Sequence, residues 1–190
     1  MNDGRHAGAL APTGRWLAGR RAFAVGVAAL VVAASAQVTV PVPMSPVPMT
    51  LQPLAVIAVG GLLGAGLGTL ALLLYIGLGL LGLPVFAGGS GGLLHVLGPT
   101  GGYLLAFPVA AALTGRIAGD ARSVWRVLLG CALAMVVIHA GGTAQLALLG
   151  GDAGAALRVG FVPFLTGDLL KIGLAAAVIL GLGPKLRALL

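Results

Sequence analysis

The chain has 190 residues, of which 59% are hydrophobic and only 8% are charged. Soluble domains carry about 25% charged residues. No Asp, Glu, Lys or Arg occurs from Ala22 through Gly115, so a water-soluble domain is excluded and an integral membrane protein is predicted. The net charge of +7 comes mainly from basic residues near the two ends and in one central loop, a pattern typical of membrane topology rather than of nucleic-acid binding.

The first apolar segment, Arg21–Val38, follows a basic arm over residues 1–20. Two arginines ahead of an apolar run, with Ala34–Gln37 after it, resemble a twin-arginine signal and its cleavage site. Since the rest of the chain inserts by itself, we expect an uncleaved first helix. Alanines four residues apart predict a packing face, used either within the bundle or by another membrane subunit. These pairs are Ala24–Ala28 and Ala29–Ala33.

Four further apolar segments follow, at Gln52–Leu83, Thr100–Gly119, Val124–Leu149 and Val159–Gly183. As one helix, the first of them would be about 48 Å long, against about 30 Å of hydrocarbon. We therefore predict two shorter helices, broken within the glycine run Gly60–Gly68. The result is an all-α membrane domain of six transmembrane helices over residues 21–183, followed by a basic tail over residues 184–190.

The basic residues favour six spans over five, because such residues beside short spans prefer the cytoplasmic side. With six spans and both termini in the cytoplasm, the arm, the central loop and the tail share one face, and only Arg158 lies outside. Three loops then face outward: the proline-rich Val40–Met49, the glycine-rich Leu83–Pro99 and the short Gly151–Arg158. We expect the proline loop to be a stiff, extended rim and the glycine loop to be a mobile lid.

An ion pair in the last span is the strongest functional signal. Asp168 and Lys171 are the only charged residues between Arg158 and Lys185. Their i,i+3 spacing turns both toward one helix face, and each charge alone in the membrane would be costly, so a protein-lined cavity is predicted. The alternative is that the two groups only neutralise each other. Lys171 should lie about 18 Å along the helix from an outer end at Val159, at 1.5 Å per residue.

Other polar residues cluster at the predicted outer ends of the helices. The string GPTGGY opens one span, where free N–H groups would suit an anion or carbonyl, and we include Gly98, Thr100, Gly101 and Tyr103 as candidate site residues. Tyr103 has an alternative role as an interfacial anchor. Gln52 and Gln145 lie at similar depths and join the candidate set. For His139, a hydrogen bond to a neighbouring helix is the preferred interpretation.

Three strings, PVPMSPVPMTLQPLAV, GLPVFAGGSGGLLHVLGPTGGYLLAF and FLTGDLLKIGLA, resemble the BioY family over about Gln37–Gly183. These proteins are the substrate-binding S components of bacterial biotin transporters of the energy-coupling-factor (ECF) type. The resemblance implies a six-helix, S-component-like bundle in the bacterial cytoplasmic membrane that captures biotin from outside. Lys171 would pair with the biotin carboxylate and Asp168 with the ureido N–H groups. The resemblance also implies two kinds of partner besides biotin and lipid: a transmembrane coupling subunit and two cytoplasmic ATPases.

Two other functions remain as alternatives. Ser90 within Gly88–Gly92 fits a serine-hydrolase pattern, with His95 or His139 as base, but its glycine-rich loop is unlike a nucleophile elbow. An ion-coupled carrier of a small carboxylated solute would use Asp168 as its titrating group. No phosphate-binding loop is present, so the chain itself does not use ATP, and the single cysteine excludes a disulfide within the chain. We expect no enzyme activity, cofactor or metal.

Overall fold

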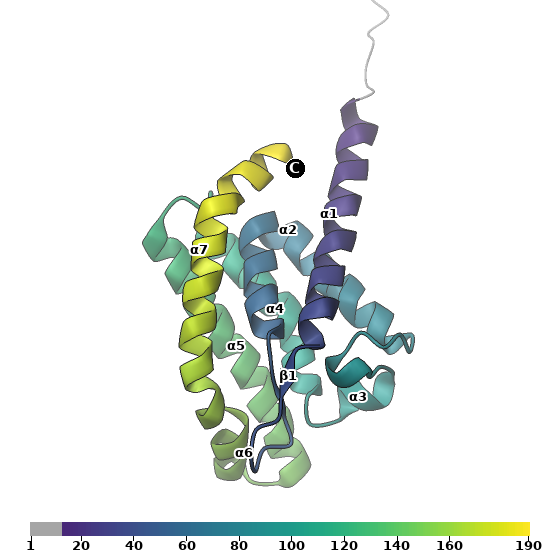
Figure 1. Cartoon of the computed structure of the whole chain (residues 1–190), viewed down its shortest axis with the longest axis vertical. Helices are drawn as coiled ribbons and strands as arrows, with labels where there is room; N and C mark the ends of the chain where they lie inside the picture. Colours follow the sequence, from purple (N-terminus) through teal and green to yellow (C-terminus); the bar gives the residue numbers. More distant parts are fainter. Residues whose placement is uncertain (1–12) are drawn as a thin grey trace, which may run out of the picture.

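The computed structural model describes residues 13–190, and these form a bundle of long helices with short elements at one end (Figure 1). Most of the described residues are helical. The long helices are α1 (Thr13–Ala36), α2 (Gln52–Leu80), α4 (Gly101–Ala118), α5 (Val124–Gly150) and α7 (Leu165–Leu189). The short elements are β1 (Thr39–Val40), β2 (Met49–Thr50), η1 (Ala87–Gly89), α3 (Leu93–Leu97), α6 (Ala153–Gly160) and η2 (Val162–Phe164).

Helix α2 is two antiparallel arms joined at Gly64. The φ of 81° and ψ of 172° at Gly64 break the helix in a region that essentially only glycine adopts. A Cβ added to Gly68 would lie 3.0 Å from the Cα of Gly60, and the Gln52 amide reaches the Tyr75 hydroxyl across 2.6 Å. Neither contact is possible along one straight helix. Five described segments are long and apolar enough to span a membrane, and this reversal divides one of them as predicted.

The helices pack through glycine. A Cβ on Gly60 would overlap the backbone of Ala111 in α4, and one on Gly115 would overlap the backbone at Ala65. At the next crossing, Gly102 of α4 and Gly141 of α5 each face the other's carbonyl oxygen. Small residues let membrane helices approach until their backbones touch, which gives dispersion contacts that lipid tails cannot match. The centre of the bundle is therefore fixed by backbone shape.

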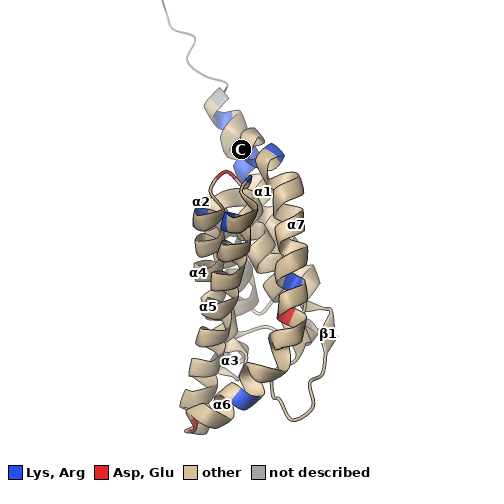
Figure 2. Ribbon diagram, turned by 90° about the vertical axis from the view of Figure 1, so that its left-hand side faces the viewer, with Lys and Arg blue, Asp and Glu red and all other residues tan. Residues whose placement is uncertain are grey.

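The two ends of the bundle differ in charge. Lys and Arg gather at the end that carries the C-terminus, with separate basic residues on α6 and α7 (Figure 2). The exceptions are Arg158 and Lys171; Arg5 lies outside the described residues. This distribution agrees with an even number of spans, and the cytoplasmic location of the termini stays a prediction from the positive-inside rule.

Several element boundaries differ from the predicted ones. The predicted outer loop Gly151–Arg158 contains helix α6, because the Asp152 carboxylate caps it by accepting from the Ala155 N–H at 3.0 Å. The last long helix begins at Leu165 rather than Val159, so Lys171 lies only about 9 Å from its start at 1.5 Å per residue. Part of the predicted N-terminal arm belongs to α1, and the predicted tail continues α7.

The proline loop is a small hairpin rather than a simple extended rim. Strands β1 and β2 pair antiparallel, with Thr39 opposite Thr50 and Val40 opposite Met49. The Ser45 hydroxyl at its tip donates to the Val159 carbonyl at 2.7 Å. The hairpin is thus tied to the last turn of α6 and lies over the end of the bundle where the candidate site is found.

Candidate functional site

Asp168 and Lys171 form a buried ion pair near the start of α7. Their residues are 4% and 6% exposed, and the Lys171 Nζ donates to the Asp168 Oδ1 at 3.0 Å. Phe161, Pro163 and the 3-10 turn η2 end the preceding helix and set the start of α7. Asp168 therefore lies at the end of the first turn of α7 and Lys171 in its second turn, on the same face of the helix. The predicted internal pairing is therefore present in this structure.

His139 of α5 joins this pair. Its Nε2 lies 2.5 Å from the Asp168 Oδ2, so both carboxylate oxygens have a partner. His139 is 5% exposed, and its Nδ1 lies 3.3 Å from the carbonyl oxygen of Gly160. The predicted bond to a neighbouring helix is found, but its partner is the ion pair itself. An ionisable residue inside a span is by default a candidate functional group, and this was the signal that could have placed His139 in the site.

A cavity of about 50 Å³ opens beside the three groups. Its apolar wall comes from α4, α5, η2 and the proline hairpin. Its polar groups come from the hairpin, the glycine loop, the long helices α2, α4 and α5, and α7. Four of the predicted site residues besides Lys171 line it: Gln52, Thr100, Tyr103 and Asp168. The other lining residues include Val47, Pro48, Leu104, Phe107, Ile138 and Phe164. Apolar walls with a few fixed polar groups are the usual construction of a small-molecule site.

Tyr103 belongs to the cavity wall rather than to an interfacial belt. Its residue is 8% exposed, and its hydroxyl donates to the Gly160 carbonyl at 2.5 Å. Its ring meets the His139 ring edge to face, with centroids 6.0 Å apart. Gly160 ends α6, so its carbonyl lacks a partner within that helix. Tyr103 and His139 supply the missing donors and connect α4, α5 and α6.

Gln52 joins the two arms of α2 to the glycine loop. Its Nε2 donates to the Tyr75 hydroxyl at 2.6 Å, and that hydroxyl donates to the Val85 carbonyl at 3.1 Å. Next to Val85, the ring of Phe86 is fully buried and packs on Gly79, where a Cβ would overlap it. The start of the predicted lid is therefore anchored in the bundle by the hydrogen bonds from Gln52 through Tyr75 to Val85 and by the buried ring of Phe86.

His95 holds the other half of the glycine loop. Its Nδ1 lies 3.0 Å from the Ser90 hydroxyl and its Nε2 lies 3.1 Å from the Thr100 hydroxyl. The imidazole stacks on Phe86 with ring centroids 5.1 Å apart. Burial lowers the pKa of His95 below its ordinary 6.5, so the ring is neutral at pH 7. Ser90 does meet a histidine, but among the described residues that histidine contacts no carboxylate that would orient it as a base.

The remaining predicted residues lie behind the cavity wall. The Gln145 Nε2 donates to the carbonyls of Val96 and Gly98, at 3.0 and 2.5 Å. A Cβ on Gly101 would overlap the Val96 carbonyl. Gly98, Gly101 and Gln145 thus fasten the loop to α4 and α5, and none of the three lines the cavity. Their contact with a ligand stays a prediction, while their contact with the loop is direct.

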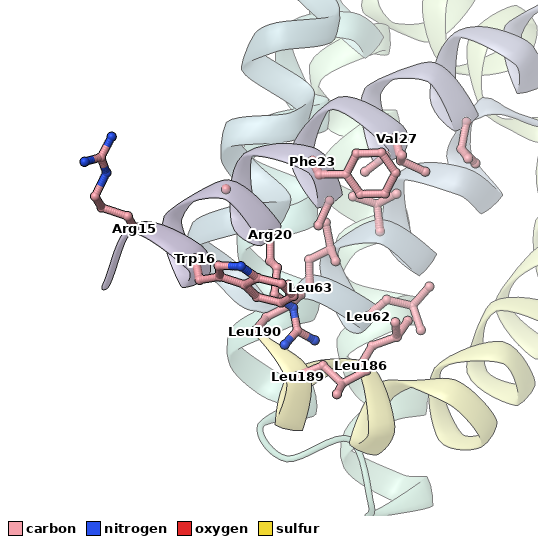
Figure 3. Close-up of a pocket in the computed structure, with 15 residues that line it drawn as sticks. Arg15, Trp16, Arg20, Phe23, Val27, Leu62, Leu63, Leu186, Leu189 and Leu190 are labelled. Atoms are coloured by element: carbon pink, nitrogen blue, oxygen red, sulfur yellow. The ribbon is translucent and has the colours of Figure 1, made fainter. Parts of the chain in front are cut away.

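A larger groove of about 680 Å³ lies at the opposite end of the molecule, between α1, the first arm of α2 and the end of α7 (Figure 3). Aromatic and aliphatic side chains line it, with two arginines at its edge. The labelled residues are Arg15, Trp16, Arg20, Phe23, Val27, Leu62, Leu63, Leu186, Leu189 and Leu190. Trp16 is 71% and Phe23 is 75% exposed, so the helix α1 presents a wide apolar face there.

Comparison with known proteins gives one consistent result. Residues 11–188 match the model of the BioY family. A probable biotin transporter BioY of Pyrococcus horikoshii is 42% identical over 152 residues, covering 80% of this chain and 90% of that protein. A biotin transporter BioY of Thermotoga maritima is also 42% identical, over 74% of this chain and 83% of that protein. The crystal structure of an S-component for biotin from an ECF-type ABC transporter superposes with a TM-score of 0.84 at 25% identity, covering 93% of this chain and 99% of that one.

Proposed function

This chain belongs to the BioY family, and we propose that it is the substrate-specific subunit of an ECF-type transporter that binds biotin and delivers it across the membrane. It is a multi-pass membrane protein and not an enzyme, so the hydrolase alternative is set aside. The observation that carries the proposal is the buried group of Asp168, Lys171 and His139 at the wall of a mostly apolar cavity. Such a group matches a ligand with an apolar body and one carboxylate.

The chemistry of biotin can be assigned to these side chains. Biotin has a carboxylate at one end, a ureido ring with two N–H donors at the other, and apolar atoms between. Lys171 pairs with the carboxylate, and Asp168 accepts from the ureido N–H groups. Because these ligand groups are far apart, the Lys171 ammonium must leave Asp168 as biotin binds. Its long, flexible side chain permits this movement, and His139 stays as the partner of Asp168.

Thr100, Gln52 and Tyr103 complete the proposed site. The hydroxyl of Thr100 and the amide of Gln52 line the cavity and offer donors to the ureido carbonyl. Tyr103 covers an apolar part of the ligand with its ring, since its hydroxyl is already bonded to Gly160. Gly98, Gly101 and Gln145 act on the ligand indirectly, because they hold the loop that closes over it.

The cavity must enlarge for biotin to bind. Its volume is about 50 Å³, whereas sites for small ligands usually measure about 300–1,000 Å³. The glycine loop is the element suited to move, since Gly82, Gly88, Gly89 and Gly92 all have positive φ and nothing lies within 4 Å of a Cβ placed on them. The loop thus has both backbone freedom and room.

The groove at the opposite end is the proposed contact for the transmembrane coupling subunit. Ala24 and Ala28 line it together with the exposed rings of Trp16 and Phe23. Small residues beside large apolar ones suit a membrane helix that packs closely, and cytoplasmic ATPases joined to that subunit would supply the energy. The alanine face predicted from the sequence thus serves both proposed roles. Ala24 and Ala28 face the coupling subunit in the groove, while Ala28 and Ala29 also pack within the bundle.

Equilibrium binding of labelled biotin to the purified full chain tests the proposal. We expect saturable binding at one site per chain, loss of binding in Lys171→Ala and Asp168→Ala, and normal binding in Ser90→Ala. Binding that is unaffected by both charge removals would refute the assigned site. For the coupling face, a photoreactive residue at position 23 should crosslink to the coupling subunit in membranes, and one at position 148, on the exposed face of α5, should not.

A further inference from the structure

The imidazole of His139 faces a hydrogen-bond acceptor on each side. Its Nδ1 lies 3.3 Å from the Gly160 carbonyl oxygen, and its Nε2 lies 2.5 Å from the Asp168 Oδ2. A carbonyl oxygen only accepts, so a hydrogen bond at this contact requires a proton on Nδ1. The Nε2 then bonds the carboxylate in one of two ways: it carries a second proton, or Asp168 carries the proton and donates it to a bare nitrogen.

Both arrangements contain the same number of protons. When both ring nitrogens form these hydrogen bonds, the His139–Asp168 pair holds one proton more than a neutral imidazole and a free carboxylate would. With Lys171 charged, the three residues together then carry a net charge of +1. Among the residues that line the cavity, no Asp, Glu, Lys or Arg other than Asp168 and Lys171 contributes to this count.

We propose that this shared proton is required for tight ligand binding, and that His139 is the residue that supplies it to the site. The proposal rests on the proposed function, in which Lys171 moves from Asp168 to the ligand carboxylate. While Lys171 stays with Asp168, the carboxylate has a cationic partner. Once Lys171 moves, the proton on the His139–Asp168 pair is what keeps Asp168 from being a buried, unpaired anion.

Charge balance gives the same result. A site of net charge +1 and a ligand of charge −1 form a neutral complex inside the membrane, whereas a site that has lost the proton forms a complex with one uncompensated negative charge. The other titratable groups near His139 are Asp168, Lys171 and Tyr103, and His95 also lines the cavity. Tyr103 is a neutral donor to Gly160, and His95 is already neutral at pH 7, so neither supplies the proton above that pH.

Calorimetric titration of the purified full chain with biotin, from pH 7 to pH 9.5, tests this inference. We expect the affinity to fall with rising pH, approaching about tenfold per pH unit, which is the limit for one linked proton. In the falling range, titrations in phosphate and in Tris should differ in heat by the uptake of up to one proton per biotin. Constant affinity and no buffer dependence over the whole range would overturn the inference. No biotin binding at any pH would instead refute the proposed function.

Two variants and one altered ligand separate this linkage from a structural role. His139→Gln can still donate to Asp168 through its amide but cannot gain or lose a proton, so its affinity should be weaker than wild type at pH 7 and independent of pH. Asp152→Asn, the matched change at the exposed carboxylate that caps α6, should keep the wild-type profile. Biotinamide, which lacks the ligand charge, should bind the wild type with a shallower pH dependence. A His139→Gln profile that follows the wild type would contradict our assignment.

Discussion

Replacement of Lys171 by methionine tests the central contact between site and ligand. Methionine keeps most of the side-chain volume and removes the ammonium group. Lys171 is 6% exposed, so an ion pair between its ammonium group and the ligand carboxylate is a buried ion pair. Truncating one partner of a buried, hydrogen-bonded charge pair costs about 2–5 kcal/mol. At about 1.4 kcal/mol for each factor of ten, the Kd for biotin should rise about 30- to 4,000-fold.

The assay is a double-mutant cycle between protein and ligand, with labelled biotin and unlabelled biotinamide in competition at pH 7. If Lys171 contacts the ligand carboxylate, the substitution should weaken biotin far more than biotinamide, because the amide has no charge to lose. Lys171→Arg, which keeps the charge, is the companion variant. A rise in Kd below about fivefold, the range of exposed ion pairs, would refute the reasoning. An equal loss for both ligands would place the carboxylate elsewhere.

Three further predictions concern the fold and the loop. Gly64→Ala should destabilise the purified protein by about 1–3 kcal/mol in thermal unfolding, because φ is positive there, while Gly66→Ala, with nothing within 4 Å of the new methyl group, should not. Gln145→Leu removes two hydrogen bonds to the loop, each with a net value of about 0.5–1.5 kcal/mol. Biotin should therefore dissociate at least about fivefold faster in stopped-flow measurements. An unchanged rate would mean that the loop does not depend on this anchor. Burial lowers the pKa of His95, so the contribution of His95 to loop stability is complete above about pH 6.5 and is lost as the pH falls through the lowered pKa. Hydrogen-exchange protection of Leu93–Leu97 should therefore decrease at low pH in the wild type. The His95→Gln variant should show no such decrease.

The features that the sequence predicted well depend on local or one-dimensional signals. The length of Gln52–Leu83 exceeds one membrane crossing, and glycine marks the weakest point, so the reversal at Gly64 followed from length and residue type. The buried pair of Asp168 and Lys171 followed from the cost of charge in lipid and from i,i+3 spacing. Helix α6 was missed because an eight-residue helix was taken for a loop, although Asp152 provided a capping signal.

The parts that could not be predicted depend on how the helices rotate against one another. His139 and Asp168 are 29 residues apart in sequence, and no local pattern indicates that α5 turns this side chain toward α7. The same applies to Gln145, which has the right depth for the cavity but bonds the loop backbone behind it. The depth of Lys171 was overestimated because Pro163 and η2 separate α6 from α7.

The backbone contacts at Gly60, Gly102, Gly115 and Gly141 also restrict the route a solute can take. Where main chains already touch, even a methyl group finds no space, and sliding one helix past another would break many contacts at once. Through the described part of the bundle, then, no passage can form between these helices without unpacking them. A solute admitted between the hairpin and the glycine loop therefore cannot continue between α2, α4 and α5.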